Sequence, residues 1–226
     1  MKRGFLIGKF TDKYHLSKSQ SLRLAEKEQS KNIYCGMRME NRAVTLDQTQ
    51  SILNGINVPN VQLDDIQAIL NMRDAWKYLL QTVNEKITFT YWCKLNEYIA
   101  RNEALEWGKL RTGSVGISGT NYIPAIPEKE KVIAGLEDIV SDKDMTATKK
   151  ALEVFVWGTR GQYFWDGNKR TSLILANKIL ISAGAGIMTI TDKYMKQFNV
   201  SLLEYYNTGK SSELKRFLYD NAIQGL

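Results

Sequence analysis

Residues 158–183 read GTRGQYFWDGNKRTSLILANKILISA, and this stretch decides the fold. From residue 170 onward its apolar side chains recur at helical spacing, until Gly184 and Gly186 end the pattern. The polar loop 164–169 comes directly before these residues. The sequence therefore predicts a buried helix that begins where the loop ends.

The start of such a helix is a favourable place for an anion. Its first backbone N–H groups have no partner inside the helix, and they form the positive end of the helix dipole. Gly167 lets a ligand approach the backbone, and Lys169 and Arg170 add positive charge. Asp166 offers an oxygen ligand that suits Mg2+. This chemistry fits a nucleotide phosphate with its metal, although the same residues also suit an ordinary capping turn.

The loop resembles the signature of the Fic (Fic/Doc) family, H-x-F-x-[D/E]-G-N-x-R-x-x-R, whose best-known members transfer AMP from ATP to a hydroxyl of a target protein. The positions that match are Phe164, Asp166, Gly167, Asn168 and Arg170. The resemblance implies that the phenylalanine anchors the loop in the core and that the aspartate holds Mg2+. It also implies that segment 167–170, including Lys169, grips the phosphates of ATP. Segment 168–171 is similar to the Doc branch, whose members phosphorylate a translation factor.

Two positions depart from the signature. Gln162 stands where the family has its catalytic histidine, and the one histidine of the chain is His15. An amide does not titrate near neutral pH, so Gln162 can orient a hydroxyl but cannot take its proton, and loss of a general base costs about 100- to 10,000-fold in rate. Leu173 replaces the second arginine. We therefore expect ATP and Mg2+ to bind, with reduced or altered chemistry.

An upstream segment resembles the inhibitory helix of the family, [S/T]-x-x-x-E-[G/N]. Glu40 and Asn41 match its last two positions, while Gly36 occupies the Ser/Thr position. In the family this glutamate reaches the second motif arginine. Because Leu173 stands there, we expect Glu40 to have lost its partner. A Glu-Asn pair at a helix end is equally consistent with ordinary surface chemistry.

A β-hairpin is predicted for residues 111–124, where the apolar period changes and a Gly-containing turn follows. The segment resembles the Fic flap, which pairs with an extended segment of the target protein. The flap residues that we expect to bind a target are Val115, Gly116, Ile117, Ser118, Gly119 and Thr120. A hairpin that only covers the core is the alternative.

Elsewhere the apolar periodicity indicates helices, so the predicted fold class is mainly α: a Fic fold, that is, a helical bundle with one small hairpin. Helices are expected over residues 19–36 and 45–55, and others are expected to begin near residues 64, 88, 127, 146, 191 and 212. We predict a basic N-terminal extension with a helix in residues 1–42. The resemblance implies a Fic domain in residues 43–226, with the motif loop at residues 162–173.

The composition and charge of the chain limit the kinds of binding partner that we expect. The chain has 226 residues, 43% of them hydrophobic, and a net charge of +7. Residues 1–42 hold ten Lys and Arg against four Asp and Glu, so the body is nearly neutral and a nucleic-acid partner is disfavoured. The absence of a long apolar run predicts a cytoplasmic protein without a membrane span. Cys35 and Cys93 lack metal-ligand spacing and are expected to be free thiols.

Three functions remain open at this point. The first is a nucleotide-dependent transferase that modifies a protein hydroxyl by adenylylation or by Doc-like phosphorylation. The second is a module that binds ATP, ADP or AMP with Mg2+, and a protein partner at the flap, without turnover. The third is a helical interaction protein in which loop 164–169 is only a helix cap.

Overall fold

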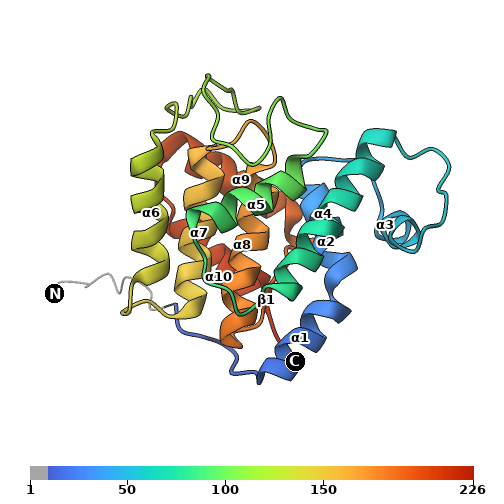
Figure 1. Cartoon of the computed structure of the whole chain (residues 1–226), viewed down its shortest axis with the longest axis horizontal. Helices are drawn as coiled ribbons and strands as arrows, with labels where there is room; N and C mark the ends of the chain where they lie inside the picture. Colours follow the sequence, from blue (N-terminus) through green and yellow to red (C-terminus); the bar gives the residue numbers. More distant parts are fainter. Residues whose placement is uncertain (1–9) are drawn as a thin grey trace.

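Ten helices and one small sheet make up residues 10–226, the part of the chain that this computed structural model describes (Figure 1). The mainly α fold class is thereby confirmed. The helices are α1 (Lys18–Lys27), α2 (Gln29–Met39), α3 (Leu46–Leu53), α4 (Leu63–Gln81), α5 (Phe89–Ala100), α6 (Lys129–Ser141), α7 (Ala147–Gly161), α8 (Asn168–Ala183), α9 (Asp192–Thr208) and α10 (Ser212–Ala222).

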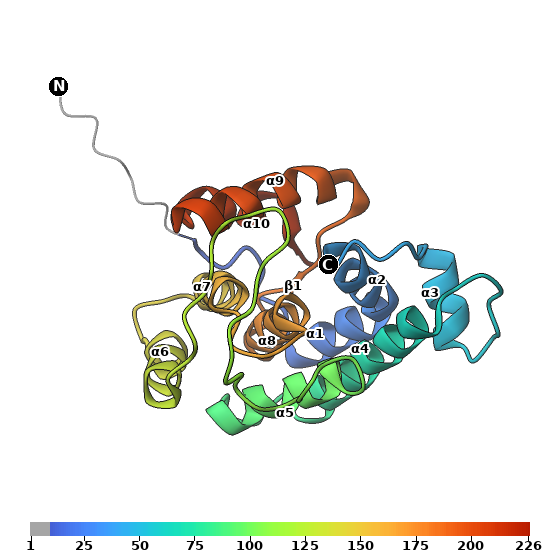
Figure 2. The same cartoon turned by 90° about the horizontal axis from the view of Figure 1, so that it is seen from above.

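Helix α8 lies at the centre of the molecule, with α7 on one side and α1, α4 and α5 on the other (Figure 2). Apart from Lys169, its side chains are buried from Asn168 to Ile181, as expected of a helix that is packed on all sides. Leu173 has no exposed surface. The residue in the position of the second motif arginine is therefore part of the hydrophobic core.

Side chains at the helix starts explain several boundaries. The Thr45 hydroxyl accepts a hydrogen bond from the backbone of Gln48, whose side chain accepts one in return, as the sequence predicts. Thr88 and Thr146 cap α5 and α7 in a similar way. The single helix expected over residues 19–36 is instead two, because Glu28 leaves helical geometry with φ −95° and ψ 6°. The bend lets α1 pack against α8 and α2 against α4.

The only sheet within residues 10–226 pairs β1 (Ile187–Met188) with β2 (Ile223–Gln224) in antiparallel fashion. The hairpin predicted for residues 111–124 has no hydrogen-bonded strands, so that prediction is wrong. Several carbonyl groups at the base of this segment accept hydrogen bonds from the Arg111 side chain instead of from a facing strand. We keep the name flap for residues 111–124, an irregular loop that turns at Gly119 and reaches α9 (Figures 1 and 2).

Residues 10–42 pack against the body of the protein. The amide of Asn32 is buried and donates to the carbonyl of Met188 at 2.7 Å, and the N–H of Leu16 donates to the carbonyl of Gly184. The rest of the predicted basic extension, residues 1–9, lies outside the described residues. Cys35 and Cys93 are free thiols. Within residues 10–226, no helix combines the length and the apolar character that crossing a membrane requires.

Candidate functional site

The loop between α7 and α8 has a constrained backbone. Helix α7 ends at Gln162 in the left-handed region (φ 47°), which is uncommon for a residue with a side chain. Gly167 precedes α8 with φ 73°. A Cβ atom there would lie 2.6 Å from a methyl carbon of Ile99, so only glycine fits at this close approach to α5. The loop is thus held against the scaffold at both of its ends.

Phe164 and Asn168 hold the loop in place from inside. The Phe164 ring is fully buried, with its centroid 4.6 Å from that of Trp92. The amide side chain of Asn168 accepts from the N–H of Phe164 at 2.9 Å and donates to its carbonyl at 2.8 Å. Both residues were predicted to bind nucleotide. Phe164 cannot touch a ligand from this position, so its role is the anchoring that the family resemblance implies, and Asn168 braces it.

The outer side of the loop presents unpaired polar groups. Helix α8 has no side-chain cap, and its internal hydrogen bonds begin with the N–H of Thr171 donating to the carbonyl of Gly167. The N–H groups of Asn168, Lys169 and Arg170 come before that bond, at the positive end of the helix dipole. Asp166 is 45% exposed beside them. The arrangement therefore offers backbone donors and one accessible carboxylate at the same point.

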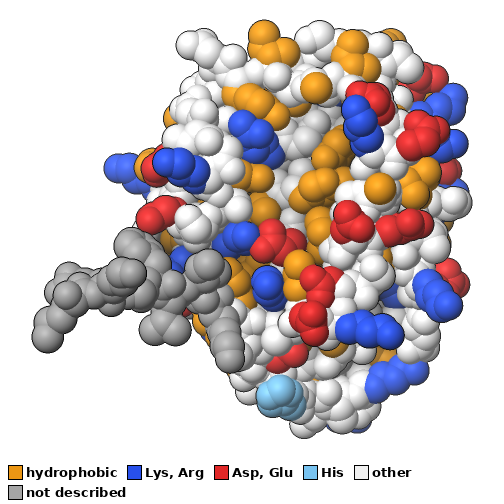
Figure 3. Space-filling view, turned by 90° about the vertical axis from the view of Figure 1, so that its left-hand side faces the viewer, with side chains coloured by type: hydrophobic (Ala, Val, Ile, Leu, Met, Phe, Trp, Pro, Cys, Tyr) orange, Lys and Arg blue, Asp and Glu red, His pale blue; other side chains and the backbone are white. Residues whose placement is uncertain are grey.

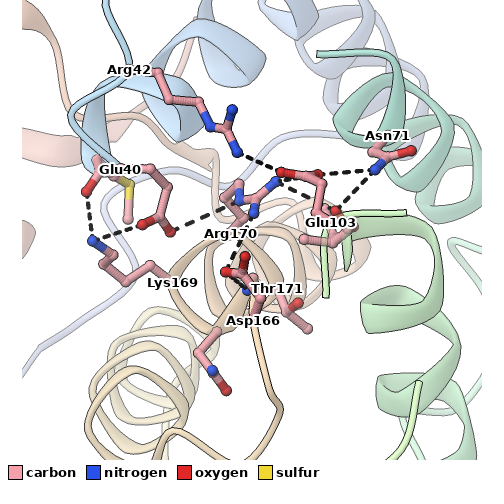
Figure 4. A network of polar contacts seen from close by, with 12 residues as sticks. Glu40, Arg42, Asn71, Glu103, Asp166, Lys169, Arg170 and Thr171 are labelled. Carbon is pink, nitrogen blue, oxygen red and sulfur yellow. Dashed lines mark hydrogen bonds and ion pairs between the residues drawn. The ribbon is translucent and has the colours of Figure 1, made fainter. Parts of the chain in front are cut away.

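Glu40, at the end of α2, lies against the two cations of the loop (Figure 4). One carboxylate oxygen is 2.9 Å from the Lys169 ammonium, and the other is 3.9 Å from the Arg170 guanidinium. The Lys169 ammonium also donates to the carbonyl of Met39. Glu40 has no arginine partner at position 173, where Leu173 is buried, but it is paired with these two other cations.

Glu103 is a site residue that the sequence analysis missed. It is 6% exposed, and its carboxylate accepts from Arg170 at 2.9 Å and from Asn71 at 3.0 Å, while Arg42 pairs with its other oxygen (Figure 4). Burial alone would lower the pKa of Arg170, but Glu40 and Glu103 raise it above its ordinary value. The guanidinium is thus fixed as a cation that faces acidic groups and is almost fully buried.

A hollow of about 330 Å³ opens beside the loop. Its walls come from the end of α2, the tip of the flap, the start of α8 and one side of α9: Met39, Asn41, Ile117, Ser118, Gly119, Lys169, Asn199, Leu202, Leu203 and Tyr206. The Tyr206 hydroxyl is buried beside the side chain of Gln162, and burial raises its pKa. Of the predicted flap residues, 117–119 thus meet Lys169 and Asn41 around one space. Asp166, Val115, Gly116 and Thr120 are not among its walls.

No titratable base is present where the family has its histidine. The side-chain amide of Gln162 donates to the carbonyl of Thr159 at 2.7 Å, and its oxygen accepts from Asn168 at 3.2 Å. His15 is next to Leu16 in the chain, and the backbone N–H of Leu16 donates a hydrogen bond to the carbonyl of Gly184, beyond the far end of α8. Because the 16 residues of this helix rise by about 24 Å, His15 cannot serve the loop.

Positively and negatively charged side chains are mixed on the surface of the protein. On the face that Figure 3 shows, Lys and Arg side chains alternate with Asp and Glu, and hydrophobic side chains surround a hollow in the upper half. Nucleic-acid binding draws on a continuous basic patch. The described residues of this face do not form one.

Part of the chain matches a known protein family. Residues 86–180 match the model of the Fic/DOC family. Protein adenylyltransferase Fic of Drosophila willistoni is 27% identical over 214 residues, which cover 89% of this chain and 42% of that protein. Its counterpart from Nematostella vectensis is 25% identical over 202 residues, covering 83% of this chain and 44% of that protein. The chain thus spans about two-fifths of the length of these curated relatives.

Solved structures show the same fold. The Fic-1 fragment (aa134 - 508) from C. elegans superposes with a TM-score of 0.76 at 22% identity, covering 92% of this chain and 64% of the fragment. A Fic domain containing signaling protein from Bacteroides thetaiotaomicron gives a TM-score of 0.69 at 18% identity, with coverages of 90% and 84%. The predicted Fic fold is confirmed by these likenesses.

Proposed function

Because residues 86–180 form a Fic/DOC family domain, we propose that the chain binds a nucleoside triphosphate such as ATP, together with Mg2+, at the start of α8. The observation that carries this proposal is the uncapped start of α8, with Lys169 facing the adjoining hollow. The phosphates accept hydrogen bonds from the backbone N–H groups of residues 168–170 and from the ammonium of Lys169. The nucleoside occupies the space between the flap tip and α9, one wall of which is formed by Tyr206.

The residues present fit a magnesium ion that arrives with the nucleotide. Within residues 10–226 no cluster of three His, Cys, Asp or Glu side chains forms a complete metal site. Mg2+ commonly binds through one carboxylate, substrate phosphates and water, and Asp166 supplies one accessible carboxylate. When bound, the ion neutralises phosphate charge. Asp166 then holds the metal while Arg170, 3.6 Å away, steadies the carboxylate from inside.

Glu40 competes with the nucleotide for the same cation. The ammonium of Lys169 is held by Glu40 and by the carbonyl of Met39, so turning it fully toward a phosphate requires its pair with the carboxylate to break. Arg170 is held more firmly, because Glu103 keeps it in place from the buried side. We therefore assign Glu40 a regulatory role that is exerted mainly through Lys169.

Transfer to a protein hydroxyl at the flap is proposed to be slow. The curated relatives are adenylyltransferases, and the flap tip adjoins the proposed nucleotide space. Gln162 cannot accept a proton, and both ends of its side chain are engaged within the fold. Proton removal then falls to water or to the target, which costs about 100- to 10,000-fold relative to an enzyme that has a general base.

Isothermal titration calorimetry with ATP and Mg2+ tests the binding. The parent is expected to release heat, Lys169→Met to bind more weakly, and Asp166→Asn to lose the dependence on Mg2+. Lys109→Met is the matched control, because Lys109 is an exposed lysine that pairs with the neighbouring Glu106. No heat from the parent, or an equal loss in the control, would contradict the proposal.

A radiolabel distinguishes the possible reactions. Cell lysate is incubated with the protein and ATP that carries the label at the α- or the γ-phosphate. Label transferred from the α-phosphate indicates adenylylation, and label from the γ-phosphate indicates phosphorylation. If neither is transferred while calorimetry still detects binding, the chain is a nucleotide-binding module without turnover.

A further inference from the structure

We propose that Arg111 is a positioning residue that fastens the flap to the turn carrying Gln162, so that both segments move as one body. The inference rests on the proposed function, in which a target hydroxyl approaches the nucleotide over the flap. Arg111 itself touches neither the proposed nucleotide space nor the charged network around Arg170.

The hydrogen bonds of Arg111 join three separate segments. Its backbone N–H donates to the carbonyl of Tyr163 at 3.0 Å, and its side-chain Nε donates to the carbonyl of Gln162. One terminal nitrogen donates to Gly113 in the first leg of the flap. The other donates to Pro124, at 3.1 Å, and to Ala125, where the second leg ends. Both legs of the flap and the end of α7 therefore meet at one guanidinium.

The electrostatic setting indicates that a guanidinium is required here. Arg111 is 1% exposed, and no carboxylate within residues 10–226 forms an ion pair with it. Burial lowers its pKa, and its side-chain donors all go to backbone carbonyl groups. A buried charge without a counterion is costly. A planar fork of donors, which lysine lacks, can satisfy several carbonyls in fixed directions at once.

Packing adds a second link between the flap and the loop. A Cβ atom at Gly113 would lie 2.7 Å from the Trp165 ring, so the first leg of the flap rests directly on the motif loop. Other contacts connect the flap to a different part of the protein. Arg160 stacks on Tyr122 with its guanidinium carbon 3.8 Å from the ring centroid and donates to carbonyls at the end of α9. Arg160, in the last turn of α7, thus ties the second leg of the flap to α9 as well as to α7, whereas Arg111 ties both legs to the carbonyl groups of the turn at residues 162 and 163.

A fixed link of this kind has a consequence for transfer. A polypeptide segment docked on the flap is held at a constant position relative to the turn at Gln162 and the start of α8. Correct placement of reacting groups supplies much of the rate of phosphoryl and nucleotidyl transfer. Placement by the flap is all the more important in a site where Gln162 cannot act as a base.

Hydrogen–deuterium exchange of the nucleotide-free protein tests the link. In Arg111→Lys we expect the hydrogen-bonded amides of both segments, those of Thr120 and Tyr122 in the flap and that of Phe164 in the loop, to exchange about tenfold faster or more, while α8 keeps its protection. Arg160→Lys is the matched control, and it should loosen residues 120–124 and the end of α9 while leaving 162–167 unchanged. Faster exchange of the flap alone, no change in either segment, or a collapse of protection throughout α8 would each overturn the proposal.

Chemical rescue adds a readout that a general packing role would not give. In Arg111→Ala, a low and non-denaturing concentration of guanidinium chloride should restore protection of both segments, and the same concentration of ammonium chloride should not. Equal effects of the two salts would count against a role for the guanidinium fork.

Nucleotide titration separates this proposal from the function on which it rests. Arg111→Lys should bind ATP with Mg2+ within about threefold of the parent affinity, because its donors face away from the phosphates. A larger loss would assign Arg111 to the nucleotide site and overturn its role as a flap fastener. If the parent itself fails to bind ATP, the proposed function is wrong, but the exchange result still decides whether the flap and the loop are joined.

Discussion

Glu40→Gln removes the negative charge that the end of α2 places beside the start of α8, and it keeps the size of the side chain. In the parent, the Glu40 carboxylate lies 2.9 Å from the ammonium of Lys169, and both side chains are 21% exposed. At an effective dielectric constant of about 20, Coulomb attraction at this distance amounts to about 6 kcal/mol. Desolvation of the two charges offsets most of it, which leaves about 1–2 kcal/mol for a partly buried pair.

This net attraction is what a phosphate has to overcome when it displaces Glu40. The amide of the variant holds Lys169 far less strongly, so ATP with Mg2+ should bind about 5- to 30-fold more tightly to Glu40→Gln than to the parent. Isothermal titration calorimetry measures the ratio directly. Raising the salt concentration should reduce the difference, because the competing interaction is ionic.

Glu97→Gln provides the control for a general effect of charge. Glu97 pairs with the exposed Lys94 at 2.7 Å on α5, so its loss should change ATP affinity less than twofold. The reasoning about Glu40 is refuted if Glu40→Gln binds ATP no more tightly than the parent. It is also refuted if the control gains as much affinity.

Three further predictions concern stability and pH. Gly167→Ala should lower the unfolding free energy by about 1–3 kcal/mol from backbone strain alone, with the contact to Ile99 adding to the loss, and differential scanning fluorimetry should show the lower Tm. Glu103→Gln breaks the buried pair with Arg170 and should cost about 3 kcal/mol, or about 6–12 °C in Tm, whereas an unchanged Tm would contradict a structural role for the pair. Burial lowers the pKa of Lys178 from 10.5 to about 8, so between these values the folded protein binds fewer protons than the unfolded chain and this group's contribution to stability rises with pH. Urea unfolding of the parent and of Lys178→Met at pH 8 and 10 should show the parent gaining stability relative to the variant, and a constant difference would exclude this titration.

Local sequence signals account for much of the fold. The start of α3 follows from the capping box at Thr45, and the start of α7 from Thr146, because a cap depends on residues within one turn. Gly184 ends α8 in the left-handed conformation that glycine favours. The buried course of α8 follows from its apolar residues. In each case the residues that decide the structure are close together in the chain.

Contacts between distant segments could not be predicted in this way. Glu103 lies 67 residues before Arg170, and nothing in its own surroundings in the sequence marks it as the partner. The contact of Glu40 with Lys169 depends on where α2 ends in space. The flap was expected to pair with itself, but donors from Arg111 take up carbonyls at its base. Tertiary hydrogen bonding thus overrode a local preference for strand.

A crystal structure of Glu40→Gln with Mg2+ and a non-hydrolysable ATP analogue tests the central claim most directly. We predict that the phosphates lie within hydrogen-bond distance of the N–H groups of Asn168, Lys169 and Arg170, with the Lys169 ammonium turned toward them and the metal at Asp166. The nucleoside should fill the hollow beside Tyr206. A nucleotide bound elsewhere, or a start of α8 still closed by the protein's own side chains at saturating analogue, would contradict the claim.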